Sequence, residues 1–454
     1  MKANTNTSGS LFELRGRPPI TSALPLALQH VVAMIVGCVT PAIIVASAVS
    51  GGGMADADKI ILIQSSLVIS ALSTLLQLFP IGKKGSWGLG SGLPMILGVS
   101  FAYVPTMQAV AAGFGVATIL GSQVVGGLIA IVIGFLIKNI RKYFPPLVTG
   151  TVVFTIGLSL YSTAINYMAG GTSSANYGSW ENWAIALFTL AVVVVLNHYG
   201  KGILKLASIL IGIIVGYAVS ACFGMVSFAS VSTAAYFQLP RLMYFGIDFE
   251  VSSCVAMGVL FAINSIQAIG DYTATTTGAM NREPTDRELQ NGIVAYGITN
   301  TLGAFFGGLP TATYSQNVGI VVTTKVINRF VLGMAAVILG VAGLIPKFSA
   351  LLTTIPYCVL GGATVNVFAS IAMTGIKLIS SAHLNFRNSA IVGLAVALGM
   401  GITMAPATLS AFPDWVTMIF GKSPVVLATI VAVALNLIIK DEDKAAGTAG
   451  AETK

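Results

Sequence analysis

The chain has 454 residues, of which 55% are hydrophobic and 8% are charged. A soluble domain carries about 25% charged residues, so this composition excludes a soluble protein and indicates an all-α polytopic membrane protein. The formal net charge of +8 predicts that one face of the protein contacts anionic lipid head groups of the bilayer, and nothing in the composition indicates nucleic acid as a partner.

A polar tail, residues 1–21, precedes the first apolar run and lacks the apolar core of a cleavable signal peptide. Apolar runs that approach the ~20 residues needed to cross a bilayer then recur along the chain, and they predict about fourteen membrane segments. A charged tail, 441–454, follows the last run. The predicted segments are 22–49, 59–80, 93–112, 113–138, 146–168, 182–198, 203–227, 252–275, 290–308, 310–324, 330–346, 351–379, 388–407 and 423–440.

The Lys and Arg residues give the expected orientation. Most of the 23 fall in loops on one side of the predicted segments. Because positively charged loops stay in the cytoplasm, both termini are expected to be cytoplasmic in a cell (inner or plasma) membrane. An even number of segments divides near residue 230 into two halves of seven, and an odd number per half predicts that the second half is inverted relative to the first.

Segments 3 and 10 are predicted to be interrupted by short extended strands. The stretches Gly92–Gln108 and Gly308–Lys325 both begin with Gly-Leu-Pro, which breaks a helix, and both continue as apolar sequence. The second is expected to become helical from about Asn317. Backbone that leaves a helix at membrane depth lines a cavity, since lipid cannot satisfy its polar groups. Paired interruptions in two halves predict the binding site of a secondary transporter, although Gly-Leu-Pro could recur by coincidence in a glycine-rich chain.

Of the 15 Asp and Glu residues, Asp271 lies inside a predicted membrane segment, whereas nearly all the others map to tails and loops. An acid inside a membrane segment is costly and predicts function. Gln267 lies four residues earlier and shares its helix face. The alternative is that Asp271 lies near the cytoplasmic end of the segment and bonds a neighbouring helix.

Amide and aromatic side chains in the interrupted segments predict the type of ligand. Gln316 and Asn317 offer groups that both donate and accept hydrogen bonds, which suits a flat, heteroatom-rich molecule such as a nucleobase. Phe101, Tyr103 and Tyr314 could stack on such a ligand, or could be packing residues.

His30 follows Gln29 in the first segment, where it could relay protons or remain a neutral histidine that bonds across helices. The four cysteines, at positions 38, 222, 254 and 358, have no metal-site or CxxC spacing and are interpreted as packing residues. No phosphate loop, nucleophile elbow or catalytic set is present, so no cofactor, metal or enzymatic activity is expected.

These motifs resemble those of the nucleobase–ascorbate transporters, also called nucleobase:cation symporter family 2. Gln316–Gly319 followed by Thr324-Lys325 resembles the family signature in the tenth segment. Gln29-His30 resembles its first-segment pair, Ile269–Tyr272 its eighth-segment motif and Ser100–Ala102 its third-segment strand. The resemblance covers essentially the whole chain, with the motifs in the expected order.

The resemblance implies a core domain and a gate domain in a homodimer that works by an elevator-type motion. The core would comprise segments 1–4 (22–145) and 8–11 (252–349), and the gate segments 5–7 (146–230) and 12–14 (350–440). The base would lie between segments 3 and 10.

The resemblance also implies roles for single residues. Gln316 would bind the base through its amide, Asn317 would shape the site, and Phe101 and Ala102 would contribute backbone or ring contacts. Gln at the first signature position is typical of members that take xanthine or uric acid, so import of such a purine by H⁺ symport is the expected function.

Two departures qualify that expectation. Gln267 and Tyr296 stand where members of the purine group usually have Glu and Asp. Since Gln267 cannot titrate, Asp271 or His30 would have to carry proton coupling. Facilitated diffusion, coupling to another ion and transport of another heterocycle (uracil or ascorbate-like) remain alternatives. An anion transporter resembling the sulfate permeases usually adds a C-terminal cytoplasmic domain, for which the sequence after 440 leaves little room, and a membrane enzyme or receptor lacks support.

Overall fold

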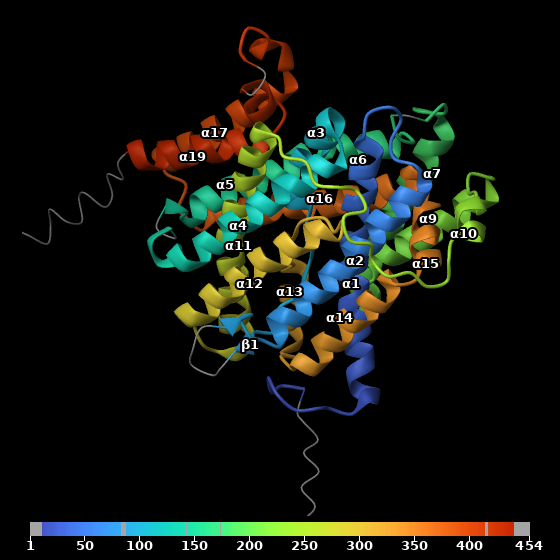
Figure 1. Cartoon of the computed structure of the whole chain (residues 1–454), viewed down its shortest axis with the longest axis horizontal. Helices are drawn as coiled ribbons and strands as arrows, with labels where there is room; N and C mark the ends of the chain where they lie inside the picture. The colour runs from blue at the N-terminus through green and yellow to red at the C-terminus, as the bar shows by residue number, and fades with distance from the viewer. Residues whose placement is uncertain (1–10, 83–87, 141–142, 173, 414–415, 440–454) are drawn as a thin grey trace, which may run out of the picture.

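The computed structural model describes residues 11–82, 88–140, 143–172, 174–413 and 416–439, and nearly all of its regular structure is helical (Figure 1). The predicted tails 1–21 and 441–454 lie outside the described residues, except for 11–21. The longer helices are α1 (Ile20–Ala48), α2 (Asp56–Leu78), α4 (Val116–Ile140), α7 (Trp180–Tyr199), α11 (Val251–Met280), α12 (Asp286–Phe305), α16 (Tyr357–Ser380) and α17 (Phe386–Met404).

Shorter helices complete the chain. They are α3 (Val104–Phe114), α5 (Pro146–Ser159), α6 (Tyr161–Met168), α8 (Ile203–Leu206), α9 (Ser208–Cys222), α10 (Ala229–Thr233), α13 (Ser315–Thr324), α14 (Arg329–Gly343), α15 (Pro346–Thr353) and α19 (Pro424–Ile438). Tighter or wider single turns occur at η1 (Phe101–Tyr103), η3 (Pro406–Leu409) and η4 (Thr417–Gly421). Two short strands, β1 (Ile81–Gly82) and β2 (Gly88–Leu89), pair antiparallel beyond the end of α2.

Among the described residues, eight helices are long and apolar enough to cross a membrane, or up to nine if α14 and α15, bent by 81°, form one span. Interrupted and broken helices are too short to count alone, so the fourteen-segment, seven-plus-seven arrangement stays a prediction. The predicted run 351–379 was wrong as one helix, because α15 ends at Thr353 and α16 begins after Pro356. Proline disfavours the helical conformation in the residue before it, which explains the break.

The two interrupted segments are confirmed. Strand β3 (Leu97–Val99) precedes η1 and α3, and strand β4 (Thr311–Thr313) precedes α13. The strands pair antiparallel, with Leu97 opposite Thr313 and Val99 opposite Thr311. Helix α13 begins at Ser315, two residues earlier than expected from the sequence.

The outer edges of this two-stranded sheet are satisfied by side chains from neighbouring helices. On α2, Ser70 accepts from the Val99 amide (3.2 Å), and Thr74 Oγ1 both accepts from Leu97 N (3.0 Å) and donates to Leu97 O (2.9 Å). On α12, Asn300 Oδ1 accepts from the Thr311 amide (2.7 Å). Unpaired backbone groups cost several kcal/mol in an apolar interior, roughly 2–7, so these contacts allow an irregular chain inside the protein.

Helices far apart in sequence lie side by side. Helix α4 packs along α11 and α12, and α2 packs against α14 (Figure 1). Separately, α16 packs on α5, α6 and α7, and α17 packs on α19. These contacts show which helices are neighbours. They do not test the division into core and gate domains, which stays a prediction.

Close approach of α5 and α16 depends on glycine. A Cβ at Gly375 would lie 2.3 Å from the backbone nitrogen of Phe154, and a Cβ at Gly157 would lie 2.5 Å from the backbone nitrogen of Ala372. Neither backbone can yield as a flexible side chain would. Small residues therefore set the distance between these two helices.

Substituting Gly375→Ala is expected to destabilise the protein by about 1–3 kcal/mol, the usual cost of overpacking a close contact. The measurement is the midpoint of thermal unfolding in detergent. Gly393→Ala on α17 is the matched control, because a Cβ there meets nothing within 4 Å. Alanine favours a helix over glycine by about 0.5–1 kcal/mol, so the control should match or exceed the wild type. Equal midpoints for the two variants would contradict this account of the α5–α16 contact.

Candidate functional site

A cavity of about 250 Å³ lies where the two interrupted segments meet α1, α11, α5, α9 and α16. Ser100 and Phe101 contribute from the first interrupted segment, and Thr313 to Gln316 from the second. The helix faces opposite them are mostly apolar, with Val153 and Val367 among their residues. The cavity is thus lined by both halves of the sequence, as the interrupted segments predict.

Phe101 and Ala102 both line the cavity, in agreement with their predicted position. Phe101 is supported from behind by Phe368, with ring centroids 5.1 Å apart in an edge-to-face arrangement. Ser100 begins this turn, and its hydroxyl accepts a hydrogen bond from the Ala102 amide (3.2 Å). The ring of Phe101 is therefore held in one orientation beside the cavity.

Tyr103 is a packing residue, which was one of the two interpretations that the sequence left open. It is fully buried outside the cavity, where its ring lies 4.9 Å from that of Phe261 and its hydroxyl bonds the hydroxyl of Tyr296. Tyr296 is equally buried and also does not line the cavity. Residues two apart on a 3₁₀ turn point about 240° apart, so Phe101 and Tyr103 cannot face the same side.

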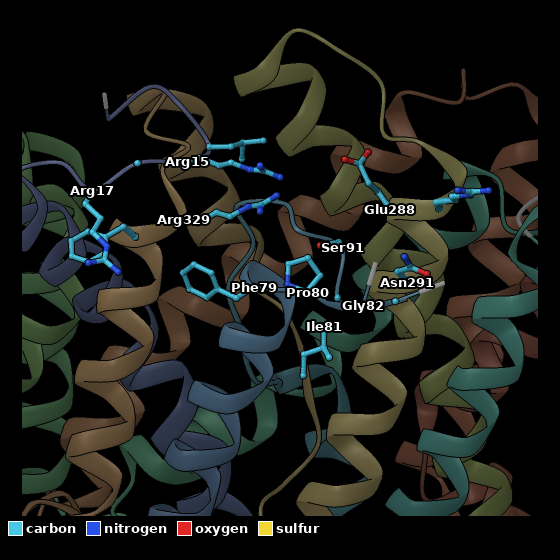
Figure 2. A pocket seen from close by; sticks show the side chains of 16 residues that line it. Arg15, Arg17, Phe79, Pro80, Ile81, Gly82, Ser91, Glu288, Asn291 and Arg329 are labelled. Atoms are coloured by element: carbon cyan, nitrogen blue, oxygen red, sulfur yellow. The ribbon is translucent and has the colours of Figure 1, made fainter. Parts of the chain in front are cut away.

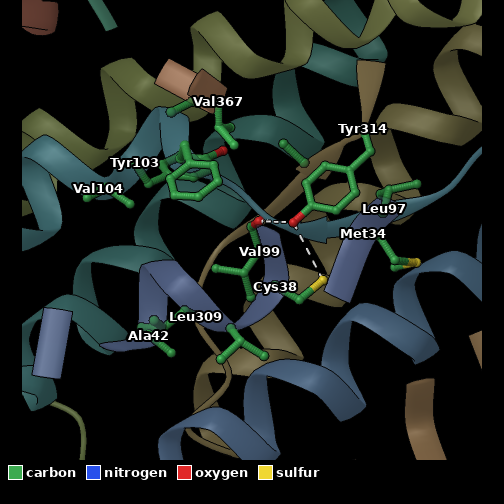
Figure 3. Packing of buried hydrophobic residues seen from close by; sticks show 14 of the residues in the cluster. Met34, Cys38, Ala42, Leu97, Val99, Tyr103, Val104, Leu309, Tyr314 and Val367 are labelled. Atoms are coloured by element: carbon green, nitrogen blue, oxygen red, sulfur yellow. Dashed lines mark hydrogen bonds between the residues drawn. The ribbon is translucent and has the colours of Figure 1, made fainter. Parts of the chain in front are cut away.

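Tyr314 lines the cavity with part of its ring, and its hydroxyl points away from it into the core. That hydroxyl donates to the Val99 carbonyl (2.5 Å) and lies 3.5 Å from Cys38 Sγ (Figure 3). Gly98 leaves room for this arrangement, since a Cβ there would lie 2.8 Å from the Tyr314 ring. The tyrosine thus ties β3 to the start of α13.

Two amide side chains reach the cavity from different elements. Gln316, in the first turn of α13, is exposed, and Gln267 projects from the middle of α11. Gln267 Oε1 is buried and has no hydrogen-bond partner among the described residues. A buried polar atom without a partner costs about 1–3 kcal/mol, which a bound ligand with a donor would recover.

Asp271 lies one helical turn from Gln267 and is buried behind the cavity wall. Thr313 Oγ1 donates to one carboxylate oxygen (2.5 Å) and Ser315 Oγ to the other (2.9 Å). Both hydroxyl residues line the cavity. The carboxylate therefore bonds the second interrupted segment, including the first residue of the neighbouring helix α13, and lies nine residues before the end of α11, so its functional and structural interpretations both stay open.

His30 and Asn317 form a pair beside this network. Asn317 Nδ2 lies 3.1 Å from His30 Nδ1 and 3.3 Å from the His30 carbonyl oxygen. With the amide nitrogen as donor, Nδ1 accepts and the imidazole is neutral at that nitrogen. The arrangement fits the interpretation of His30 as a structural histidine that bonds across helices. Gln29 is half-buried and does not line the cavity.

The end of the signature closes helix α13. Thr324 donates to the Ile320 carbonyl (2.8 Å), and Lys325 follows in a left-handed conformation with φ 59°. The ammonium of Lys325 bonds the Gly278 carbonyl near the end of α11. Thr324 thus closes the last turn of α13, and Lys325 holds the end of α13 to α11. Nothing in the structure explains Gly319, where a Cβ would meet no atom within 4 Å.

Sequence reasoning missed several polar residues that build the site. Ser370 and Thr374 on α16 line the cavity opposite Gln316, and their spacing of four along an apolar helix was the available signal. On α2, Ser66, Ser70, Thr74 and Gln77 form a similar stripe at helical spacing that faces the interrupted segments. Hydroxyl and amide residues on one face of a membrane helix are typical of contacts to irregular backbone.

The described lining of the cavity contains no charged or titratable acid, base or histidine side chain. Its polar groups are neutral hydroxyls and amides, and the N-terminus of α13 opens into it at Ser315 and Gln316. A helix N-terminus carries a partial positive charge and favours electron-rich groups. The site therefore suits a neutral or weakly anionic molecule with several carbonyl and N–H groups.

The sequence profile of the family Xan_ur_permease, described as a permease family, matches residues 21–408. A xanthine permease of Bacillus subtilis is 35% identical over 426 residues, covering 93% of this chain and 94% of that protein. The uric acid permease PucJ of Bacillus subtilis is 35% identical, with coverage of 92% and 93%. The xanthine permease XanQ of Escherichia coli is 32% identical over 456 residues, covering 96% of both chains.

Solved structures share the fold at low sequence identity. The transmembrane domain of the cyanobacterial bicarbonate transporter BicA aligns with a TM-score of 0.59 at 17% identity, covering 91% of this chain and 97% of that one. The murine anion transporter Slc26a9 in an inward-facing state aligns with a TM-score of 0.63 at 12% identity, covering 92% and 68%. At such identities the likeness shows a common membrane fold and carries nothing about the substrate.

Proposed function

The chain belongs to the Xan_ur_permease family of multi-pass membrane permeases, and from this premise we propose that it imports a purine nucleobase of the xanthine or uric acid class. The observation that carries the proposal is the pair of amide side chains, Gln267 and Gln316, that face one small cavity beside the Phe101 ring. Oxopurines present alternating carbonyl and N–H groups around a flat ring. Amides match both kinds of group, and an aromatic side chain matches the faces.

The size of the cavity supports a free base. Drug-sized ligands occupy pockets of roughly 300–1,000 Å³. A cavity of about 250 Å³ is smaller and equals the volume of roughly eight water molecules at ~30 Å³ each. A bicyclic base fits within it, whereas a nucleoside would also need room for its sugar.

We assign proton coupling to Asp271, as part of this proposal. Gln267 cannot titrate, and the Asn317 contact occupies Nδ1 of His30. An ionised Asp271 accepts from both Thr313 and Ser315, whereas a protonated carboxyl keeps one oxygen for donation. On protonation one hydroxyl would reverse and accept from the carboxyl, which frees its own proton for donation into the cavity and links the proton to the base without a charge in the lining.

The remaining elements of the proposal concern architecture. The helices around the two strands would form a core domain, and the helices around α16 would form a gate domain past which the core moves in an elevator-type motion. The cavity lies where residues of both groups meet, which is the arrangement that such a motion requires. The protein would act as a homodimer in the cell membrane, with both termini cytoplasmic.

Uptake of radiolabelled bases into proteoliposomes tests the proposal. Xanthine or uric acid is expected to enter faster than uracil, ascorbate or adenine, and an imposed inward proton gradient is expected to accelerate entry. Substrates can be ranked by competition against the labelled base. Saturable uptake of uracil or ascorbate but not of the oxopurines would remove the substrate assignment.

Facilitated diffusion or coupling to another ion remains the second candidate, because the cavity lining of this chain has an amide at Gln267. The same proteoliposomes distinguish it from symport. Oxopurine uptake that is saturable but indifferent to the proton gradient would keep the substrate assignment and exclude H⁺ symport.

A further inference from the structure

A second pocket, which shares no lining residue with the cavity, lies at the end of α2 where the N-terminal segment, α12 and α14 meet (Figure 2). Its volume is about 790 Å³. The Lys and Arg distribution predicts that this face is cytoplasmic. The proposed transport function does not use this pocket.

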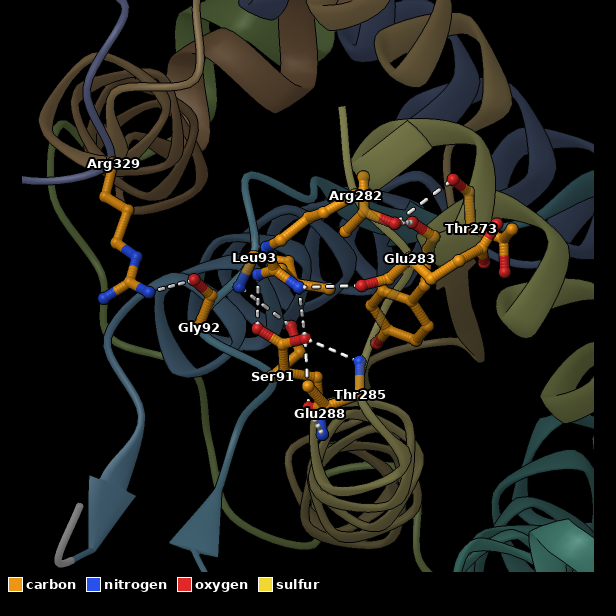
Figure 4. Close-up of polar contacts among 11 residues, drawn as sticks. Ser91, Gly92, Leu93, Thr273, Arg282, Glu283, Thr285, Glu288 and Arg329 are labelled. Carbon is orange, nitrogen blue, oxygen red and sulfur yellow. Dashed lines mark hydrogen bonds and ion pairs between the residues drawn. The ribbon is translucent and has the colours of Figure 1, made fainter. Parts of the chain in front are cut away.

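Four arginines from three separate parts of the chain line this pocket: Arg15, Arg17, Arg287 and Arg329. Glu288 is the single carboxylate among the described lining residues, and it already forms a bidentate pair with Arg282 at 2.6 and 2.8 Å (Figure 4). The acid is thus neutralised by a cation outside the lining. Arg15, Arg17 and Arg329 by themselves give the described lining an excess of positive charge.

Hydrogen bonds to backbone atoms hold the N-terminal segment, which carries Arg15 and Arg17, against the start of α14. The Arg329 amide donates to the Leu14 carbonyl (3.3 Å), and Asn328 Nδ2 donates to the Glu13 carbonyl (3.1 Å). These bonds fix the N-terminal segment across the start of α14. In Figure 2 the guanidinium groups of Arg15 and Arg329 consequently lie next to each other, although like charges repel.

Arg329 has an unfilled hydrogen-bonding position. Its terminal nitrogen bonds the Gly92 carbonyl (Figure 4), while its Nε atom is buried and has no partner among the described residues. Gly92 adopts φ 68°, and a Cβ there would lie 2.7 Å from the guanidinium. The backbone thus holds the arginine in place with one donor unused.

We propose that this arginine pocket binds a phosphate group, carried by an anionic phospholipid or by a soluble phosphate compound. Planar guanidinium groups match phosphate oxygens with paired donors, and an anion between Arg15 and Arg329 replaces their repulsion with attraction. Asn291 adds an amide to the lining. Ligand binding would link the N-terminal segment, α2, α12 and α14.

The apolar part of the lining fits a phospholipid as well as a soluble ligand. Phe79 and Ile81 are 48% and 66% exposed beside the arginines. An acyl chain could cover them while its head group reaches Arg15, and an aromatic soluble phosphate could stack on Phe79 instead. The two sources share one binding chemistry and differ in what covers the apolar residues.

Thermal unfolding of the purified full chain in uncharged detergent tests the proposal. Short-chain phosphatidylglycerol and inorganic pyrophosphate are titrated separately, with phosphatidylcholine and sodium sulfate at equal ionic strength as comparisons. At least one of the two phosphate probes is expected to raise the midpoint by about 3 °C or more, and the shift should grow with the logarithm of ligand concentration. A response to phosphatidylglycerol alone identifies a lipid source, and a response to pyrophosphate identifies a soluble one.

The variant Arg15→Gln/Arg17→Gln is expected to lose this shift. Both side chains are exposed and the backbone, not the guanidinium groups, holds the segment, so the unliganded midpoint should match the wild type. Lys201→Gln/Lys205→Gln removes two charges from another exposed segment and should keep the full shift. If the double variant is unstable, Arg15→Gln alone should lower the shift by at least half.

Three results would overturn the proposal. The first is an equal shift in the Arg15→Gln/Arg17→Gln variant and the wild type. The second is no shift with either phosphate probe, and the third is a shift that sulfate reproduces. Base uptake does not enter this measurement, so its outcome is independent of the transport function.

Discussion

Replacing Gln316 by alanine is expected to lower the transport efficiency for the preferred oxopurine by roughly 100-fold. The side chain lies in the first turn of α13 and is exposed to the cavity opposite Ser370 and Thr374. Loss of two amide contacts leaves donors or acceptors of the bound base unpaired, at a cost of about 2–3 kcal/mol, and each 1.4 kcal/mol is about tenfold. Initial uptake rates across a concentration series in proteoliposomes give the comparison.

Gln290→Ala is the matched control, since Gln290 lies on α12 outside the cavity lining. It should transport at the wild-type rate. Gln316→Glu gives a further comparison, because an ionised carboxylate accepts hydrogen bonds but donates none. It is expected to reject anionic urate more strongly than neutral xanthine. Unchanged uptake by Gln316→Ala would place the base somewhere other than this cavity.

Asp271→Asn is expected to abolish the response of uptake to a proton gradient and to slow uptake at least tenfold. Asparagine has one acceptor oxygen, so Thr313 and Ser315 can no longer both donate to the side chain at position 271. One hydroxyl must reverse and accept from the asparagine amide nitrogen, so the contact pattern changes while the titrating group is lost. The residual uptake should be the same with and without an imposed gradient, because an amide does not titrate.

Ser315→Ala separates coupling from hydrogen bonding. It removes one donor to the carboxylate but leaves Asp271 able to titrate, so slower uptake that still responds to the gradient is expected. Asp58→Asn is the control for loss of a carboxylate, since Asp58 lies near the start of α2 and accepts from Tyr244 (2.7 Å) at the surface. If uptake by Asp271→Asn still responds to the proton gradient, a residue other than Asp271 carries the proton coupling.

The sequence predicted the interrupted segments because proline and glycine act locally on the backbone. It did not predict their register, because pairing depends on distant side chains. Strand β4 begins at the residue after Pro310, where Asn300 binds its first amide, whereas β3 begins three residues after Pro94. Aligning the two interrupted segments by their Gly-Leu-Pro motifs therefore pairs Ser100 with Gln316. In the structure the equivalent of Gln316 is Ala102, because each is the second residue of the helical turn that follows its strand.

Residue type likewise predicted some of the site but not its geometry. Gln267, Phe101, Ala102 and Gln316 reach the cavity: three of them lie in the interrupted segments, and Gln267 is an amide on the membrane helix α11. The sequence could not decide between stacking and packing for Tyr103, since a shift of one residue along a 3₁₀ turn changes the direction of the ring. The contributions of α16 could not be foreseen, as the sequence does not state which distant helix closes a cavity.

The pairing of β3 with β4 also restricts how this chain can evolve. Side chains on a strand alternate between two faces, so one inserted or deleted residue in 311–313 would turn Ala312 toward Asp271 and Thr313 away from it. The same change would also displace the Thr311 amide from Asn300, which holds the start of the strand. New substrate preferences in descendants of this protein should therefore arise by point substitutions, while the number of residues in these two strands stays constant. Insertions and deletions among them should be confined to the connecting loops.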